Sequence, residues 1–141
     1  AVDKVLFWMA DQGRLGRKSK SGFYAYADTG DRLGLWEGLQ SKFPRDKAQP
    51  SLTDVQHRLL FAQVLEAVRA LEQGVLTDIR EGDVGAILGW GFAPWSGGPF
   101  SWLDIIGAAR AVEICRSLTA QFGPRFQAPA LLREVAEKGE T

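Results

Sequence analysis

The residues best suited to chemistry lie in one basic segment, Gly13-Arg-Leu-Gly-Arg-Lys-Ser-Lys-Ser-Gly-Phe-Tyr-Ala-Tyr26. The segment contains three glycines and four cationic residues, Arg14, Arg17, Lys18 and Lys20. Guanidinium and ammonium groups bind phosphates, so the segment suits a nucleotide such as coenzyme A, or a nucleic acid. A structural role suits it equally well, because glycines allow backbones to approach closely and the arginines can pair with acidic groups elsewhere.

Two functions are disfavoured for this segment. The spacing Gly13-x-x-Gly16 does not follow an expected strand, so the dinucleotide-binding fingerprint is not met, and no Walker-type lysine is present. The whole chain of 141 residues has 17 basic and 17 acidic side chains, a formal net charge of +0. A nucleic-acid-binding domain is usually basic overall, so we expect no nucleic-acid partner.

His57 is the only histidine and lies near the start of an expected helix, on the same face as Leu60, Phe61 and Val64. A partly buried histidine satisfied by backbone groups is the structural interpretation. The alternative is a general base or proton relay, which needs a carboxylate or a nucleophile folded against the ring. The sequence does not specify that partner.

The remaining reactive side chains indicate no catalytic centre. Cys115 is the single cysteine, which excludes an intramolecular disulfide framework, and its place on an apolar helical stripe predicts a buried thiol. Asp78, Glu81 and Asp83 cluster near a helix start, where carboxylates stabilise the positive end of the helix dipole. No set of side chains has the spacing of metal ligands. No apolar run approaches the roughly 20 residues that span a bilayer, and no signal peptide is visible.

Hydrophobic periodicity predicts an all-α chain. The longest expected helix covers residues 54–73, with Thr53 and Gln56 as a capping box and Gly74 as its C-cap. A further helix over 80–89 is capped by Asp78, and Pro99 opens a short helix over 100–106. The other expected helices cover residues 3–11, 31–43, 108–122 and 130–138.

Several blocks together closely resemble the C-terminal part of 3-hydroxyacyl-CoA dehydrogenases, above all the multifunctional α subunits of fatty-acid oxidation. They are the basic segment and the runs Gln56-His-Arg-Leu-Leu60, Glu66-Ala-Val-Arg-Ala-Leu-Glu-Gln-Gly74, Asp83-Val-Gly-Ala-Ile-Leu-Gly-Trp-Gly-Phe92, Gly97-Gly-Pro-Phe-Ser-Trp-Leu-Asp104 and Arg125-Phe-Gln-Ala-Pro-Ala-Leu-Leu-Arg133. The resemblance implies the helical bundle of that C-terminal domain. It further implies that residues 1–26 end a first helical repeat, 27–50 are a linker with one helix, and 51–141 are a second repeat.

The resemblance also implies what this chain lacks. In that family a Rossmann domain binds NAD and holds a catalytic His–Glu pair, and no residue here matches that pair. The first helical repeat begins with an Asn–Arg pair whose Asn lines the active site, and His57-Arg58 stand at the matching position. The chain is therefore expected to be inactive alone and to bind no cofactor. Arg14, Arg17, Lys18 and His57 are its candidates for contact with substrate, coenzyme A or another domain.

The expected parent protein is an NAD-dependent 3-hydroxyacyl-CoA dehydrogenase of fatty-acid β-oxidation, with enoyl-CoA hydratase as a further activity. We expect the start Ala1-Val2-Asp3 to be a cut into that longer protein. The implied partners are its own Rossmann domain and first repeat, the acyl-CoA substrate and a thiolase subunit. The implied location is the bacterial cytoplasm, or mitochondria or peroxisomes in a eukaryote. The alternative function is a helical module that docks a partner subunit.

A helical domain of this family covers its exposed face by dimerising, and a second repeat can cover the same face internally. The isolated chain is then expected to expose apolar surface and to self-associate. The candidate surface residues are Trp8, Phe23, Tyr24, Trp90, Trp95 and Trp102.

Overall fold

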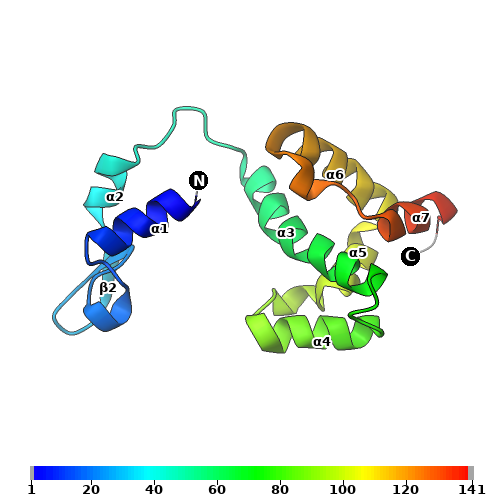
Figure 1. Cartoon of the computed structure of the whole chain (residues 1–141), viewed down its shortest axis with the longest axis horizontal. Helices are drawn as coiled ribbons and strands as arrows, with labels where there is room; N and C mark the ends of the chain where they lie inside the picture. The colour runs from blue at the N-terminus through cyan, green and yellow to red at the C-terminus, as the bar shows by residue number, and fades with distance from the viewer. Residues whose placement is uncertain (1, 140–141) are drawn as a thin grey trace. The chain divides into compact units, whose positions relative to one another are not determined.

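The computed structural model describes residues 2–139, which fall into two compact units, Ala1–Gln49 and Pro50–Thr141. Each unit is described by itself. Helices dominate, as the sequence predicts, and the one sheet among the described residues is a two-stranded hairpin in the first unit (Figure 1). No described helix is long and apolar enough to cross a membrane.

The first unit is a helix followed by a hairpin and a short second helix. Its elements are α1 (Val2–Asp11), the 3-10 turn η1 (Arg17–Ser19), β1 (Tyr24–Tyr26), β2 (Arg32–Leu35) and α2 (Glu37–Lys42). Trp8 of α1 stacks on Trp36 at 5.5 Å between ring centroids and meets Phe43 edge-on at 5.3 Å. Met9 is the single fully buried hydrophobic side chain among the described residues of this unit. The unit therefore has almost no core of its own.

The helix predicted over residues 31–43 is wrong in its first half. Residues Arg32–Leu35 form β2, which pairs antiparallel with β1, and only Glu37–Lys42 is helical. Gly30, at φ 88°, reverses the chain, and the Trp36 N–H donates to the Phe23 carbonyl at 2.9 Å. These long-range backbone bonds outweigh the helical spacing of Leu35, Trp36 and Leu39.

Over its described residues, 50–139, the second unit is a bundle of five α-helices. They are α3 (Leu52–Glu72), α4 (Ile79–Trp90), α5 (Pro99–Ile106), α6 (Ala108–Phe122) and α7 (Ala130–Lys138), with 3-10 turns η2 (Pro94–Ser96) and η3 (Pro124–Phe126). The expected ranges of the last four helices agree with these to within one residue at each end. The core is one cluster built around Phe61, Val64, Leu65, Phe92 and Leu118.

Helix α3 is capped at both ends, as predicted, but a different residue caps its start. The N-cap is Ser51, whose Oγ accepts from the Asp54 N–H at 3.0 Å, so the prediction of Thr53 as N-cap is wrong. Both hydroxyl residues precede the apolar stripe, and backbone geometry selects Ser51 because its extended φ and ψ suit an N-cap. At the other end Gly74 takes φ 73°, and the Val75 N–H bonds the Ala70 carbonyl as in a Schellman motif.

Short helix α5 touches α3, α4 and α6, so its placement sets the arrangement of the bundle. A side chain from α4 fixes its start. Asp83, 8% exposed, accepts from the Phe100 N–H at 2.7 Å, the Ser101 N–H at 3.0 Å and the Ser101 hydroxyl at 2.6 Å. Gly98 makes this approach possible, because a Cβ there, at φ 118°, would collide with Asp83. The sequence interpretation of Asp83 as a helix-dipole carboxylate of its own helix is wrong, because it caps the next one.

We predict that Asp83→Ala lowers the free energy of unfolding of the chain by about 2–4 kcal/mol, because it leaves buried N–H groups at the start of α5 without an acceptor. Urea unfolding followed by far-UV circular dichroism measures the loss. The matched control is Glu81→Ala on the same helix, an exposed carboxylate without a hydrogen bond in the described structure. Equal losses for the two variants would contradict the role given to Asp83.

Candidate functional site

The basic segment forms a closed turn at its centre. The Gly16 and Ser21 backbones exchange two hydrogen bonds, at 2.8 and 3.2 Å, and the Ser19 hydroxyl lies 2.9 Å from both of their carbonyl oxygens. Gly22 packs against Gly16 so closely that a Cβ would stand 2.9 Å from the Gly16 Cα. The glycines therefore serve a tight backbone crossing. We call residues 16–21 the basic turn.

Arg14 is committed within its own unit. Its Nε donates to the Gly22 carbonyl at 2.8 Å, and its Nη2 donates to the Tyr24 carbonyl at 3.1 Å. Its guanidinium also lies 4.1 Å from the ring centre of Trp36. Arg14 thus joins α1, the hairpin and the start of α2, and these contacts hold its guanidinium within the unit.

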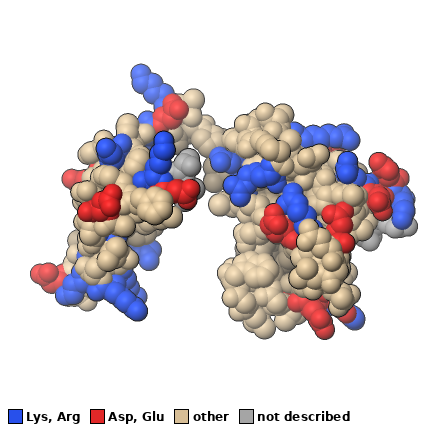
Figure 2. All heavy atoms as spheres, in the orientation of Figure 1, with Lys and Arg blue, Asp and Glu red and all other residues tan. Residues whose placement is uncertain are grey.

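The other cations of the segment point outward. Arg17, Lys18 and Lys20 are exposed, and none makes an ion pair within residues 2–139. Lys20 donates instead to the Asp28 carbonyl at 3.2 Å. Figure 2 shows basic side chains gathered at the hairpin end of the first unit. The structure separates one structural arginine from three available cations.

His57 lies in the second unit, near the start of α3. It is half-buried, and its ring meets Phe61 edge-on at 6.0 Å between centroids. In the described part of the chain no carboxylate, nucleophile or backbone group is hydrogen-bonded to the imidazole. The described residues therefore do not supply the partner that His57 would need as a general base. Its ring is packed against another aromatic side chain.

The carboxylates near α4 have structural partners. Asp78 is the N-cap of α4, and it also pairs with Arg80 at 2.7 Å. Hydrogen bonds from the Arg80 side chain and backbone lower the pKa of Asp78 to about 2. Among the described residues no group of three His, Cys, Asp or Glu side chains is arranged to hold a metal ion.

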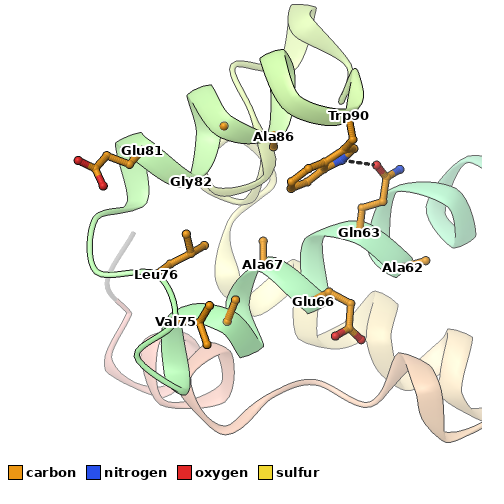
Figure 3. A pocket seen from close by; sticks show the side chains of 12 residues that line it. Ala62, Gln63, Glu66, Ala67, Val75, Leu76, Glu81, Gly82, Ala86 and Trp90 are labelled. Atoms are coloured by element: carbon orange, nitrogen blue, oxygen red, sulfur yellow. Dashed lines mark hydrogen bonds between the residues drawn. The ribbon is translucent and has the colours of Figure 1, made fainter.

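An apolar groove of about 510 Å³ separates α3 from α4 (Figure 3). Trp90 closes one end, where its indole N–H donates to the Gln63 side-chain oxygen at 3.0 Å. Small residues line both walls, namely Ala62, Ala67 and Ala70 on α3 and Gly82, Gly85 and Ala86 on α4. The sequence interpretation missed this groove, although the small residues at helical spacing were its signal. The lining is mostly apolar, and its charged members are the two carboxylates Glu66 and Glu81.

Cys115 is 2% exposed on α6, as its place on the apolar stripe predicts. Burial raises the pKa of its thiol from 9.0 to about 11, and the positive charge of Arg69 offsets only part of that rise. A thiol with a raised pKa remains protonated at neutral pH and is a poor nucleophile.

The described residues do not fit a dinucleotide site. Such a site needs parallel strands with a glycine-rich turn leading into a helix. The sheet described here is an antiparallel hairpin, and the glycines of the basic turn follow helix α1. No step of hydride chemistry can be assigned to these residues.

Comparison with known proteins gives the class of this chain. Residues 55–141 match the model of the 3-hydroxyacyl-CoA dehydrogenase C-terminal domain. The chain therefore belongs to the 3-hydroxyacyl-CoA dehydrogenase C-terminal domain family, as the sequence blocks predict.

Two curated relatives are similar over nearly the whole chain. The fatty acid oxidation complex subunit alpha of Shewanella halifaxensis is 38% identical over 143 residues, covering 99% of this chain and 19% of that protein. The protein of the same name from Shewanella amazonensis is 38% identical over 145 residues, covering 100% and 20%. The chain thus spans about a fifth of the length of these relatives.

The buried thiol predicts a pH dependence of stability. Between about pH 9 and pH 11 the unfolded chain loses the Cys115 proton while the folded chain retains it, so rising pH favours unfolding. This group alone lowers the free energy of unfolding by at most about 1.4 kcal/mol per pH unit in that window. Urea titrations at several pH values measure the slope. Cys115→Ala is the reference, and a slope unchanged in that variant would contradict the assignment.

Proposed function

We propose that this chain is the C-terminal part of a multifunctional α subunit of fatty-acid oxidation, whose other domains carry NAD-dependent 3-hydroxyacyl-CoA dehydrogenase activity. The observation that carries the proposal is similarity over the whole chain to subunits about five times longer. The chain supplies a helical packing domain, and catalysis and NAD binding belong to the remainder. Both relatives are bacterial, which favours the bacterial cytoplasm as the location.

The two units differ in how complete they are, which supports the proposed boundary near residue 50 and a second repeat over residues 51–141. Unit two has a cluster of buried side chains, whereas unit one buries Met9 alone among its described hydrophobic residues. Exposed Leu6, Phe7 and Leu15 in the first unit lack a covering layer. We infer that residues before Ala1 in the full protein cover α1.

A correspondence between α1 and α7 supports the same inference. Both helices lead to a glycine in the left-handed region, Gly13 at φ 68° and Gly139 at φ 69°. Counted back from these glycines, Val5, Leu6, Met9 and Ala10 match Leu131, Leu132, Val135 and Ala136. Leu132 packs into the core at 4% exposure, whereas the matching Leu6 is 49% exposed. Helix α1 then corresponds to the last helix of a first repeat whose core precedes it.

The partners follow from this assignment. The chain packs against its own Rossmann domain and first repeat, the substrate of the full protein is an acyl-CoA, and a thiolase subunit completes the complex. Arg17 and Lys18 are exposed and suit contacts with these partners, whereas His57 is half-buried and packs against Phe61. A helical module that only docks a partner subunit is the second candidate, supported by the apolar α3–α4 groove.

We predict that the isolated chain does not reduce acetoacetyl-CoA with NADH, whereas the full-length protein does, because the described residues do not fit a dinucleotide site. NADH absorbance at 340 nm measures the reaction in both cases. Reduction by the isolated chain, or failure of the full-length protein, would contradict the proposal. The docking-module alternative predicts that neither protein is active.

We also predict that the isolated chain self-associates, because α4 and its flanking turn expose Leu88, Trp90 and Trp95 at 80%, 60% and 76%. Trp102, an expected surface residue, is buried at 7%, while Trp8 and Tyr24 are half-buried, so these do not contribute. Sedimentation velocity at rising concentration measures association. Leu88→Glu should weaken it more than Leu52→Glu, which changes a leucine of similar exposure, 74%, at the start of α3. A chain that remains monomeric throughout would refute the prediction.

A further inference from the structure

The basic turn presents three cations in four positions on a closed backbone. Arg17, Lys18 and Lys20 are exposed, and no carboxylate occurs between Gly13 and Ala27. The hydrogen bonds that close the turn hold its backbone in one conformation, so little backbone entropy is lost when the side chains bind. The turn therefore presents three exposed cations on a backbone that is already ordered.

Lys20 occupies an unfavourable backbone conformation. At φ 52° it is the single non-glycine residue of the described chain with a positive φ. Left-handed backbone is usually left to glycine or asparagine, and departures cluster where a side chain is used. The Lys20 ammonium spends one donor on the Asp28 carbonyl at 3.2 Å and retains two for a further acceptor.

Residues 17–20 of the turn are all exposed, so the turn does not enclose a ligand. Small molecules are generally bound in concave sites, so the turn alone cannot hold a whole cofactor. It can contact the charged outer end of a ligand whose remainder is held elsewhere. Coenzyme A has such an end, since its 3′-phosphate and pyrophosphate stand far from the thioester.

We propose that Arg17, Lys18 and Lys20 bind the phosphate groups of the coenzyme A part of the substrate in the full-length protein. The inference rests on the proposed function, which makes an acyl-CoA the substrate, and names the residues that hold its nucleotide end. Arg14 is not assigned to this contact, because Gly22, Tyr24 and the Trp36 ring hold its guanidinium within the first unit. The alternative binding partner of these three cations is an acidic protein surface.

The test is steady-state kinetics of the full-length protein carrying R17Q and K18Q together. Two substrates are compared, acetoacetyl-CoA and acetoacetyl-pantetheine, which keeps the reacting end and lacks the phosphorylated nucleotide. We expect KM for the CoA ester to rise about three- to tenfold with kcat unchanged, as the loss of two exposed charge contacts predicts. KM for the pantetheine ester should be unchanged, and the difference should shrink with added salt because exposed charges are screened.

The matched control is R45Q with K47Q, two exposed cations of the first unit outside the basic turn. It should change neither KM. The proposal would be overturned if R17Q with K18Q changed KM equally for both esters, or changed it for neither. It would also be overturned if the variant lowered the melting temperature without a difference in KM between the esters, a result that would indicate an acidic protein surface as the partner. If the full-length protein reduces neither ester, the proposed function fails, and calorimetric titration with coenzyme A and 3′-dephospho-coenzyme A decides the phosphate contact separately.

Discussion

The carboxylate of Asp83 accepts three hydrogen bonds at the start of α5, and the helical unit depends on that junction. Helix α5 is only eight residues long, too short to be stable alone, yet it touches α3, α4 and α6. The buried carboxylate joins α4 to free N–H groups of α5, and it therefore sets the position of α5. Gly98 is required because any side chain there would displace Asp83. Pro99 completes the junction, since the first turn of a helix needs no N–H at that position.

The two units bury their apolar side chains in different ways. The helical unit encloses a cluster of apolar side chains and leaves a groove of small residues, with Leu88, Trp90 and Trp95 exposed at and after the end of α4. The first unit replaces a core with aromatic stacking and one arginine. Arg14 bonds two carbonyls of the hairpin and covers Trp36, so a charged side chain does much of what hydrophobic packing does elsewhere. The described part of the first unit therefore buries little apolar surface of its own.

Much of the helical architecture could be predicted because its signals are local. Apolar periodicity and flanking Gly and Pro residues place α5, α6 and α7 to within one residue. The hairpin could not be predicted, because β1 and β2 are three and four residues long and depend on pairing across the turn. Of the candidate site, the cationic composition was evident in the sequence. Which cations are available was not, since Arg14 and Arg17 look alike until the carbonyls of Gly22 and Tyr24 are in place.

The sequence by itself determined the family of this chain and the order of its helices, because motif spacing and periodicity are properties of neighbouring residues. Tertiary structure decided the roles of individual side chains. Asp83 follows Asp78 and Glu81 in one acidic cluster, yet Asp78 caps its own helix and Asp83 caps the next, while Glu81 remains exposed. His57 meets Phe61, one turn further along α3, as their shared helical face predicts, and only the tertiary structure shows that no described carboxylate is hydrogen-bonded to the ring. The role of Asp83 depends on partners 17 and 18 residues further along the chain, which a local sequence pattern does not specify.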